Sequence, residues 1–515
     1  HRAAAPPVRR PAGCSLRGMK VPDPVAYWAG SEPARPAVRW AGGVLSYGEL
    51  DRRQRATACR LAGLGVTKGA RVALLLRNGV PFVVLVGALA RLGAVCVPLH
   101  VRLAGPELRW RLEDCAPQLL LTEPELQDLA AEAGWKQTVC VDPEHPELLP
   151  DARPEPVRLQ DRYPGAAVQG ILYTSATTGE PKGAQLTFAN HFWNALYSNL
   201  HLGCGPEGGW LVVLPLYHVG GLAVLWRAAL SGSVVVLHDR FDPDAFNHEV
   251  DLGVAYTSLV PTMLDRVLQS RAARPVPASL RAVLLGGGPV PAELVVQAAR
   301  RGWPVAPTYG LTEAASQVAT LHPAVALYRP DSAGRPLLGV EVRAGRSAQE
   351  PGEILVRGPT VMKGYFRRPE ATARTLRGGW LHTGDVGYVD PEGHLHVLDR
   401  REDLIVTGGE NVYPAEVEAV LRAHPAVAEA AVVGLPDPQW GQQVVGFVRV
   451  RPGMVADPQE LVSFCRARLA GFKVPRRVWI IDRLPRAGLD KVSRRRLREL
   501  AAQLLAEGRA CGKPW

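Results

Sequence analysis

The chain has 515 residues, of which 47% are hydrophobic, and its formal net charge is +11. Its length and apolar content predict a soluble globular protein of two to four domains, each with a buried core. Eight cysteines lie far apart without a C-x-x-C motif, so we expect reduced thiols in a cytoplasmic protein. The positive charge suits either nucleic acid or small polyanionic substrates and does not decide between them.

The start of the chain differs from the rest. Residues 1–18 are rich in Arg, Ala and Pro and lack the apolar segment of a secretory signal, so we expect a leader outside the fold, with Met19 as an alternative start. The most apolar region, 80–99, is interrupted by prolines and glycines. It predicts a helix followed by a strand, and no membrane span is expected.

Short apolar strands alternate with helices from residue 72 onward. Strands are expected at 72–76, 94–97, 118–122, 210–215, 234–237 and 281–285. One helix should be opened by Pro81 and closed at Gly93, with further helices after Pro106 and near Pro291. This alternation predicts an α/β fold in which a parallel sheet carries helices on its faces.

The pattern changes twice in the second half of the chain. Short alternating strands such as 352–358 and 393–398 indicate a β-rich subdomain after Arg335. Beyond it, a helix at 415–423, strands at 428–433 and 444–450, and helices from Asp457 and Ser493 indicate a small α+β domain. We therefore expect an N-terminal domain over 19–398, a hinge over 399–402 and a mobile C-terminal domain over 403–515.

Residues 173–183, Y-T-S-A-T-T-G-E-P-K-G, form a turn that is suited to phosphate. Glycines let the backbone approach an anion, hydroxyls can bind its oxygens or a metal, and Lys182 supplies a positive charge. The turn is not a Walker P-loop, because Lys182 follows Gly179 by three residues and precedes another glycine. Taken alone, the motif is equally compatible with a plain surface loop.

Five further motifs follow the turn. They are L-L-G-G-G-P at 284–289, T-Y-G-L-T-E at 308–313, G-W-L-H-T-G-D-V-G at 379–387, the segment 399–418 with an Arg and a Gly pair, and 484–497. The glycines expose backbone at a strand end, where nucleotides bind in open α/β sheets. Tyr309 offers a flat ring for stacking, Asp385 two oxygens for ribose hydroxyls, and Lys491 is expected on an exposed turn.

These six motifs, in this order, resemble the adenylate-forming superfamily of acyl-CoA synthetases, adenylation domains and luciferases, over about Tyr47 to Leu500. The resemblance implies an ATP-dependent ligase that forms an acyl-adenylate and then a CoA thioester, with ATP, Mg²⁺ and CoA as cofactors. It assigns nucleotide and CoA binding to Thr174, Ser175, Thr177, Thr178, Gly179, Gly286, Gly287, Gly288, Thr308, Tyr309, Gly310, Thr312, Asp385, Arg400, Gly408 and Gly409.

The resemblance also implies the catalytic residues, which are Lys491, Glu313, Lys182 and His218. Glu313 and Thr174 would bind Mg²⁺, and Lys491 would bridge the substrate carboxylate and the α-phosphate. Rotation about Glu402 would then withdraw Lys491 and bring in Gly408, Gly409 and Glu410 to line a channel for the pantetheine arm. Lys473 is expected either to bind CoA phosphates or to be a solvated surface charge.

Two positions depart from the pattern of the superfamily. Ala176 stands where glycine is usual, which makes the geometry of the phosphate turn less certain. Asp490 stands where glycine commonly precedes the catalytic lysine, and its carboxylate would either hold Lys491 charged or compete with the substrate for it.

The segments expected to line the acyl pocket are particularly similar to the o-succinylbenzoate-CoA ligases of menaquinone synthesis. They are 215–221, 226–227, 258–263, 286–289 and 312–321. The substrate residues that this implies are His218, Arg227, Ser258, Gly287 and Ser316. Such an acid has two carboxylates, and Arg227 could neutralise the one that is not activated, the alternative being that its side chain reaches the surface.

Two histidines are expected to differ. His218 lies at a strand-to-helix entry and should contact the aromatic ring or close the acyl tunnel, whereas His191 should only pack at a helix start. The expected partners are a carboxylic acid, ATP and CoA, without nucleic acid, and a homodimer is left open. Alternatives are an aryl or medium-chain fatty acyl-CoA synthetase, a carrier-loading adenylation domain, a non-catalytic nucleotide-binding homologue, or a nucleic-acid binder.

Overall fold

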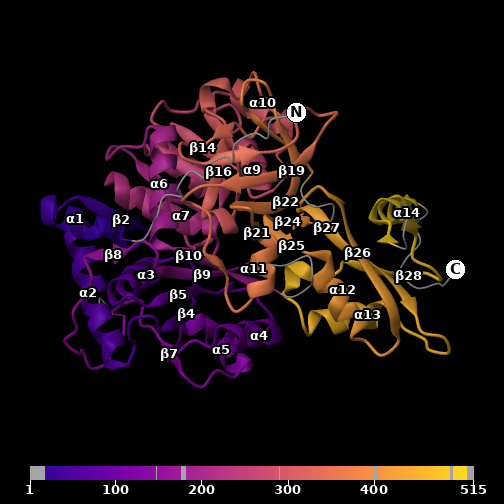
Figure 1. The fold of residues 1–515 in the computed structure, drawn as a ribbon, viewed down its shortest axis with the longest axis horizontal. Helices are drawn as coiled ribbons and strands as arrows, with labels where there is room; N and C mark the ends of the chain where they lie inside the picture. The colour runs from indigo at the N-terminus through magenta and orange to yellow at the C-terminus, as the bar shows by residue number, and fades with distance from the viewer. Residues whose placement is uncertain are drawn as a thin grey trace, which may run out of the picture.

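The computed structural model describes residues 18–145, 148–174, 181–288, 290–399, 404–487 and 491–506. Its N-terminal part consists of layered sheets and helices, and the smaller C-terminal part lies beside it at the right of Figure 1. The six described cysteines are all free thiols. No helix in the described ranges combines the length and hydrophobicity needed to cross a membrane.

The first large sheet has seven strands in the order β20-β10-β9-β5-β4-β6-β7. The strands are β4 (Arg71–Leu75), β5 (Val95–Pro98), β6 (Leu119–Thr122), β7 (Thr138–Cys140), β9 (Val168–Thr174), β10 (Lys182–Thr187) and β20 (Gly364–Tyr365). From β9 to β7 the strands are parallel, as the alternation predicted, and the apolar runs of β4, β5 and β6 are buried on both faces. The antiparallel edge strands β10 and β20 were not predicted.

The second large sheet has nine strands in the order β17-β16-β15-β14-β13-β11-β12-β2-β3. They are β2 (Pro36–Trp40), β3 (Gly43–Ser46), β11 (Gly209–Val212), β12 (Val234–Leu237), β13 (Tyr256–Leu259), β14 (Ala282–Leu285), β15 (Val305–Leu311), β16 (Ser316–Thr320) and β17 (Arg335–Pro336). Its central strands are parallel. The strand predicted at 210–215 ends at Val212, and the remaining residues form the loop that leads to His218.

Helices cover both sheets. They are α1 (Pro24–Ser31), α2 (Tyr47–Gly63), α3 (Val80–Leu92), α4 (Gly105–Cys115), α5 (Gln127–Ala133), α6 (Phe188–Leu202), α7 (Val219–Ser231), α8 (Pro243–Asp251), α9 (Pro261–Arg271) and α10 (Ala292–Arg300). One core cluster joins α2, α3 and α7 to inner residues of both sheets, including Leu74 and Val235. As predicted, α3 has Pro81 in its first turn and ends at Gly93 in a left-handed conformation.

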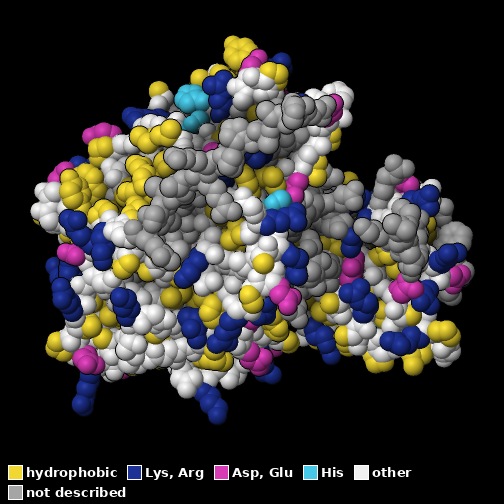
Figure 2. Space-filling view, in the orientation of Figure 1, with side chains coloured by type: hydrophobic (Ala, Val, Ile, Leu, Met, Phe, Trp, Pro, Cys, Tyr) yellow, Lys and Arg dark blue, Asp and Glu magenta, His cyan; other side chains and the backbone are white. Residues whose placement is uncertain are grey.

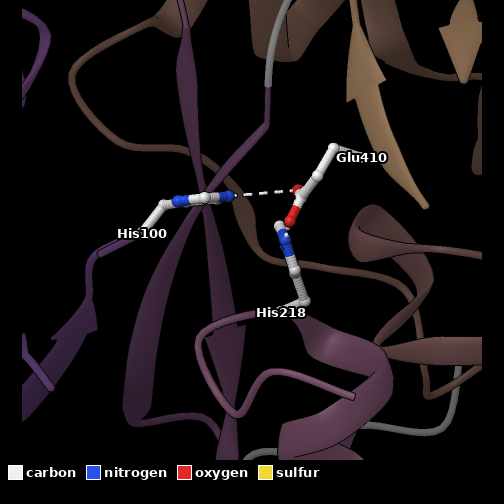
Figure 3. A group of neighbouring side chains, drawn as sticks. All are labelled: His100, His218 and Glu410. Atoms are coloured by element: carbon white, nitrogen blue, oxygen red, sulfur yellow. Dashed lines mark hydrogen bonds and ion pairs between the residues drawn. The ribbon is translucent and has the colours of Figure 1, made fainter. Parts of the chain in front are cut away.

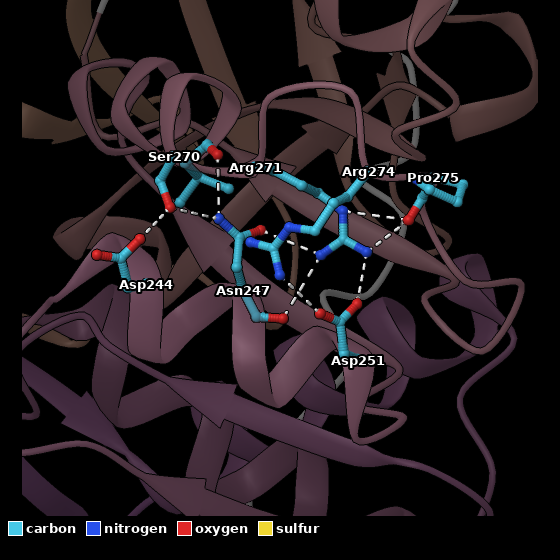
Figure 4. A network of polar contacts seen from close by, with 8 residues as sticks. Asp244, Asn247, Asp251, Ser270, Arg271, Arg274 and Pro275 are labelled. Carbon is cyan, nitrogen blue, oxygen red and sulfur yellow. Dashed lines mark hydrogen bonds and ion pairs between the residues drawn. The ribbon is translucent and has the colours of Figure 1, made fainter.

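A polar network joins α8 to α9 and to the loop that follows α9 (Figure 4). The side chain of Arg271 is buried, forms an ion pair with Asp251 at 2.5 Å and donates to the carbonyl of Pro275 at 2.5 Å. Asn247 accepts from the same guanidinium at 3.2 Å. Because it joins Asn247 and Asp251 of α8 to Pro275, this arginine closes the loop after α9, and it is not part of the cavity lining described below.

The β-rich subdomain follows as predicted, as a five-stranded sheet. Its elements are β18 (Glu341–Arg343), β19 (Gly352–Arg357), β21 (Leu376–Arg377), β22 (Trp380–Val389) and β23 (Leu395–Asp399), with helix α11 (Pro369–Thr375). The short elements η1 (Pro124–Leu126), η2 (Thr312–Ala314) and η3 (Pro323–Val325) are 3₁₀ turns, and β1 (Lys20–Pro22) pairs with β8 (Arg162–Pro164).

The C-terminal part, residues 404–506, has the predicted α+β pattern, and we call it the lid. It contains β24 (Ile405–Thr407), β25 (Glu410–Val412), α12 (Pro414–Arg422), β26 (Val427–Asp437), β27 (Gly441–Val450), α13 (Pro458–Arg466), η4 (Gly471–Lys473), β28 (Arg477–Ile480), β29 (Arg486–Ala487), β30 (Lys491–Val492) and α14 (Arg494–Ala506). The expectation of Lys491 on a turn is wrong, because its backbone pairs with Ala487 in the small β29–β30 sheet.

Candidate functional site

A cavity of about 750 Å³ lies between the N-terminal part and the lid. Loops at the carboxyl ends of the parallel strands β11, β13 and β14 line one side, which is where open α/β sheets bind their ligands. Lid residues 408–411, 413 and 472–473 line the opposite side. The site therefore depends on how the lid is placed.

The predicted nucleotide residues that line this cavity come from several elements. They are Thr174, Gly286, Gly287, Thr308, Gly310, Thr312, Asp385, Gly408 and Gly409, and the predicted magnesium ligand Glu313 lines the cavity with them. A side chain at Gly286 would lie 2.8 Å from the carbonyl oxygen of Thr308, and Gly287 has a positive φ of 78°. Glycine is required at both positions, which leaves bare backbone facing the cavity.

Tyr309 lies differently from the prediction. Its side chain is only 2% exposed and packs in a core cluster with Val318 and Leu337, outside the lining of the cavity. Its hydroxyl donates to a carboxylate oxygen of Asp385 at 2.6 Å. The tyrosine thus positions Asp385, and stacking on adenine stays a prediction that needs the ring to become exposed.

Glu313 has a partner that the sequence did not suggest. Its Oε1 accepts from the hydroxyl of Tyr365 at 2.8 Å, and the ammonium of Lys182 lies 5.5 Å from the centre of the same ring. Tyr365 comes from the edge strand β20, which pairs with β10 beside Lys182. In the sequence it stands in a short Lys-Gly-Tyr turn whose only signal is the glycine, and nothing there links it to Glu313.

The predicted magnesium ligands fit a hard cation. The Glu313 carboxylate and the Thr174 hydroxyl both line the cavity, and carboxylate and hydroxyl oxygens are the donors that Mg²⁺ prefers. The Tyr365 bond occupies one Glu313 oxygen and leaves the other for a metal. The hydroxyl of Thr174 lies 3.3 Å from the carbonyl of Lys182.

Several predicted residues cannot be compared with the structure. Ser175, Thr177, Thr178, Gly179, Arg400 and the hinge residue Glu402 lie outside the described residues, as do Ala176 and Asp490. The same holds for the side chain of Lys491. Gly288 is described, but it lies beside Val406 of the lid and outside the cavity lining.

A buried cation lines the cavity where the acyl pocket was predicted. Arg227 is 1% exposed, which contradicts the alternative that its side chain reaches the surface. Its Nη2 donates to Ser316 Oγ at 3.1 Å, and its guanidinium lies over the ring of Trp210. Burial lowers the pKa of Arg227 to about 10, so the side chain is still charged at neutral pH.

Three buried polar atoms around this cation have no hydrogen-bond partner among the described residues. They are Arg227 Nε, Ser258 Oγ and Gln317 Oε1, and all three side chains line the cavity. A buried charge without a counterion is costly unless a ligand completes it. The backbone beside them is strained, because Ser316 has a φ of 116°, which is rare for any residue but glycine.

His218 caps the start of α7 and points toward the lid. Its Nε2 lies 3.0 Å from Glu410 Oε2, and His100 Nε2 lies 3.1 Å from the same oxygen (Figure 3). Arg102 forms an ion pair with the other oxygen of Glu410. His100 and Arg102 were missed by sequence reasoning, although they follow β5 at a strand end, where functional residues often lie.

Burial and the neighbouring side chains together set the charges of Glu410 and His100. Burial raises the pKa of Glu410, but the neighbouring His218 and His100 outweigh it, so that the pKa lies well below its usual value. Burial lowers the pKa of His100 to about 4. A charged lid carboxylate therefore rests on a neutral imidazole at neutral pH.

The lid also narrows the cavity. Gly408 and Gly409 have positive φ values of 57° and 83°, and a side chain at these positions would lie 2.9 Å from the ring of Trp440 and 3.0 Å from Val260. Only glycine leaves room at these two positions, and the channel for the pantetheine arm stays a prediction.

Two further expectations concern buried side chains. His191 packs as predicted, with its ring stacked on Trp226 at 5.8 Å. Lys473 is not a surface charge, because it is 3% exposed and forms ion pairs with Glu107 at 2.5 Å and Glu416 at 2.8 Å. With its ammonium neutralised by two carboxylates, binding of CoA phosphates by Lys473 is not supported in this arrangement.

Comparisons with known proteins identify the family of the chain. Residues 25–366 match the family model of AMP-binding enzymes, and 416–491 match the AMP-binding enzyme C-terminal domain. The 2-succinylbenzoate–CoA ligase of Geobacillus kaustophilus is 43% identical over 91% of this chain and 95% of that protein.

Solved structures of the o-succinylbenzoate CoA synthetase of Bacillus subtilis are similar along 93% of this chain and 98% of theirs, at 38% identity. A double mutant bound to a product analogue gives a TM-score of 0.88, whereas the enzyme with its acyl-adenylate intermediate gives 0.71. The same enzyme has been solved with ATP and a magnesium ion. The arrangement of domains here is thus nearer to that of the product-analogue complex.

Proposed function

Because the chain belongs to the family of AMP-binding enzymes, we propose that it is an ATP-dependent ligase that joins 2-succinylbenzoate to CoA, in menaquinone synthesis. The observation that carries the choice of acid is the buried Arg227 guanidinium in the cavity, whose Nε has no partner among the described residues. A carboxylate would complete it, and the substrate has one carboxylate to spare after the other is activated.

In the first half-reaction, an oxygen of the substrate carboxylate attacks the α-phosphorus of ATP and pyrophosphate leaves. Asp385 would accept hydrogen bonds from the ribose, and the bare backbone of Gly286 and Gly287 lets the nucleotide approach. Magnesium held by Glu313 and Thr174 would neutralise charge on the phosphates. Lys491 would hold the attacking carboxylate against the α-phosphate, since two anions meet there.

In the second half-reaction, the CoA thiol attacks the acyl carbon and AMP leaves. Gly408 and Gly409 leave a channel past Trp440 for the thiol arm, and Glu410 holds His218 at the side of the cavity. The similarity to the product-analogue complex supports assigning the present arrangement to this half-reaction. Lys491 lies in the β29–β30 sheet, directly before helix α14 in the chain. In Figure 1, α14 lies at the end of the lid that is farthest from the N-terminal part.

The proposal includes the division of the chain. The N-terminal domain over 19–398, the hinge over 399–402 and the C-terminal domain over 403–515 agree with family matches on either side of the hinge. We place the enzyme in the cytoplasm, where its substrates ATP and CoA are available, and the homodimer stays a prediction. Lys and Arg are interspersed with acidic side chains on the face in Figure 2, which favours small anions over nucleic acid as partners.

The test is turnover with ATP, CoA and a panel of acids, followed by the mass of the product. We expect pyrophosphate release and a CoA thioester with 2-succinylbenzoate, at a kcat/KM at least about 100-fold above those with benzoate or octanoate. Equal or greater activity on a monocarboxylic acid would reject the proposed substrate and favour another acyl-CoA synthetase. A thioester formed only on a carrier protein would favour a carrier-loading adenylation domain.

A further inference from the structure

Lys473 is buried where the lid meets the N-terminal domain, between carboxylates from both sides. Its ammonium lies 2.5 Å from Glu107 Oε1 of α4 and 2.8 Å from Glu416 Oε1 of α12. Lysine is rarely buried unless it is paired, because its charge loses hydration. Lys473 and Glu416 belong to the lid, so their pair moves with it, whereas the bond to Glu107 exists only when the lid is docked as here.

Both carboxylate oxygens of Glu107 contact the lid. Its Oε2 accepts from the backbone N–H of Ala104, which caps α4, and from the N–H of Ala470 in the lid at 2.5 Å. Burial raises the pKa of Glu107, but Lys473 and Arg111 outweigh it and hold the pKa below its usual value. The charged carboxylate thus binds the lid through an ammonium and a backbone amide at once.

The contact lies next to the reacting groups. Phe472, which precedes Lys473, stacks on His100 at 5.2 Å, and His100 contacts Glu410. The docked η4 turn is therefore continuous with the wall of the cavity formed by Glu410 and His218. A shift at Lys473 would move the channel glycines that follow β24.

Resting on the proposed function, we propose that Glu107, Lys473 and Glu416 form a latch that positions the lid for thioester formation and has no part in adenylate formation. Glu107 makes the latch specific for the docked lid, because it is the one member of the three that lies outside the lid. Its bonds to Lys473 and Ala470 form when the lid docks, and water replaces them when the lid turns away. Lys473 and Glu107 act through the position of Gly408, Gly409 and Glu410, so they are positioning residues.

The test is Glu107→Gln, measured in each half-reaction separately. The amide is nearly isosteric but must turn a donor toward either the ammonium or a backbone N–H, so the latch loses at least one charged hydrogen bond. We expect thioester formation from supplied acyl-adenylate and CoA to slow by about 10- to 100-fold, with ATP–pyrophosphate exchange changed less than about twofold. Lys473→Met should slow thioester formation in the same way. Lys473→Arg, which keeps the positive charge, should slow it less than Lys473→Met does.

The matched control is Glu49→Gln. Glu49 occupies the same third position of helix α2, where it caps Ser46, but it lies away from the lid. It should change neither half-reaction. Equal slowing of both half-reactions by Glu107→Gln, or no slowing of thioester formation, would overturn the latch.

Hydrogen exchange tests the contact without turnover. In the intact protein the amide of Ala470 should be protected by Glu107, and Glu107→Gln should speed exchange in a peptide covering 468–474. Unchanged exchange there would show that the latch is absent in solution. Failure of the wild type to use 2-succinylbenzoate would reject the proposed substrate, while this measurement still decides the latch.

Discussion

At the scale of single residues, Arg227 is the side chain that we expect to determine which acid the enzyme accepts. Replacing it with methionine keeps most of the volume but removes the charge that would meet the second carboxylate. We expect Arg227→Met to raise KM for 2-succinylbenzoate by about 10- to 100-fold, since a hydrogen bond to a charged group contributes about 1.5–3 kcal/mol. Steady-state kinetics with benzoate as the second acid should show a change of less than about threefold.

Arg271→Met is the matched control for loss of a buried arginine. It removes a guanidinium that is equally buried but lies in the network of Figure 4, away from the cavity. It should lower the stability of the protein without altering the ratio of the KM values for 2-succinylbenzoate and benzoate. A parallel change in that ratio for both variants would remove Arg227 from the acyl site.

His191 is expected to make the protein sensitive to mild acid. Burial lowers its pKa to about 4, and both ring nitrogens have no hydrogen-bond partner among the described residues. The unfolded chain takes up a proton below its pKa of about 6.5, whereas folded His191 stays neutral to about pH 4. Stability therefore falls as pH drops from 6.5 to 4, by at most about 3 kcal/mol from this residue.

His191→Leu should remove this pH-dependent loss of stability, because leucine does not take up a proton. Leucine also fills a similar volume against Trp226 and has no polar atom to desolvate. Urea unfolding at pH 7 and pH 5 should show a gain of about 1 kcal/mol at pH 7 and a smaller loss between the two pH values than in the wild type. An unchanged pH dependence would mean that His191 is hydrated in solution.

At the scale of elements, the start of α7 positions His218 and fixes the helix that contains Arg227. It approaches the loop after β11 so closely that a methyl group at Gly221 would overlap the carbonyl of Pro215. We expect Gly221→Ala to destabilise the protein by about 2 kcal/mol or more, because backbone must move, and to raise KM for the acid. Thermal unfolding and kinetics measure the two effects.

The neighbouring position is the control. A methyl group at Gly220 would meet only Leu214 Cδ1 at 3.5 Å, an ordinary contact. Since alanine favours helices by up to about 1 kcal/mol over glycine, Gly220→Ala should be neutral or stabilising. Similar losses for the two variants would contradict the close approach of α7 to this loop.

At the scale of the whole molecule, the two half-reactions should respond to opposite changes. Lys491→Ala should abolish adenylate formation and leave thioester formation from supplied adenylate nearly intact. Gly409→Leu should do the reverse, because a side chain there meets Val260 and strains a positive φ. Single-turnover assays of each half-reaction separate the outcomes, and loss of both in either variant would argue against alternation of the lid.

Much of the fold could be predicted from local patterns. The strands of the parallel regions, the Pro81 and Gly93 ends of α3 and the α+β pattern of the lid all follow from periodicity and helix-end chemistry. The antiparallel edge strands β10 and β20 could not be predicted, since pairing between residues 185 and 364 leaves no local signal.

The candidate site was predicted in part. The motifs of glycine, hydroxyl and carboxylate residues were found because their spacing is local. Ten residues from these motifs line one cavity. Tyr365, His100 and Arg102 were missed because each gains its role only from a partner far along the chain. For Tyr309 the structure adds a bond to Asp385 that the sequence did not suggest, because composition does not tell a ring that faces a ligand from one that supports a neighbouring carboxylate.

The sequence by itself determined the family and the order of the elements, because motif spacing and apolar periodicity are properties of neighbouring residues, and it predicted which residues would meet the nucleotide. Only the tertiary structure decided that Arg227 is buried, that Lys473 joins two domains and that Glu410 rests on two histidines. The reason is physical. The state of a charged side chain depends on its solvent and its partners, and these are brought to it by segments hundreds of residues away.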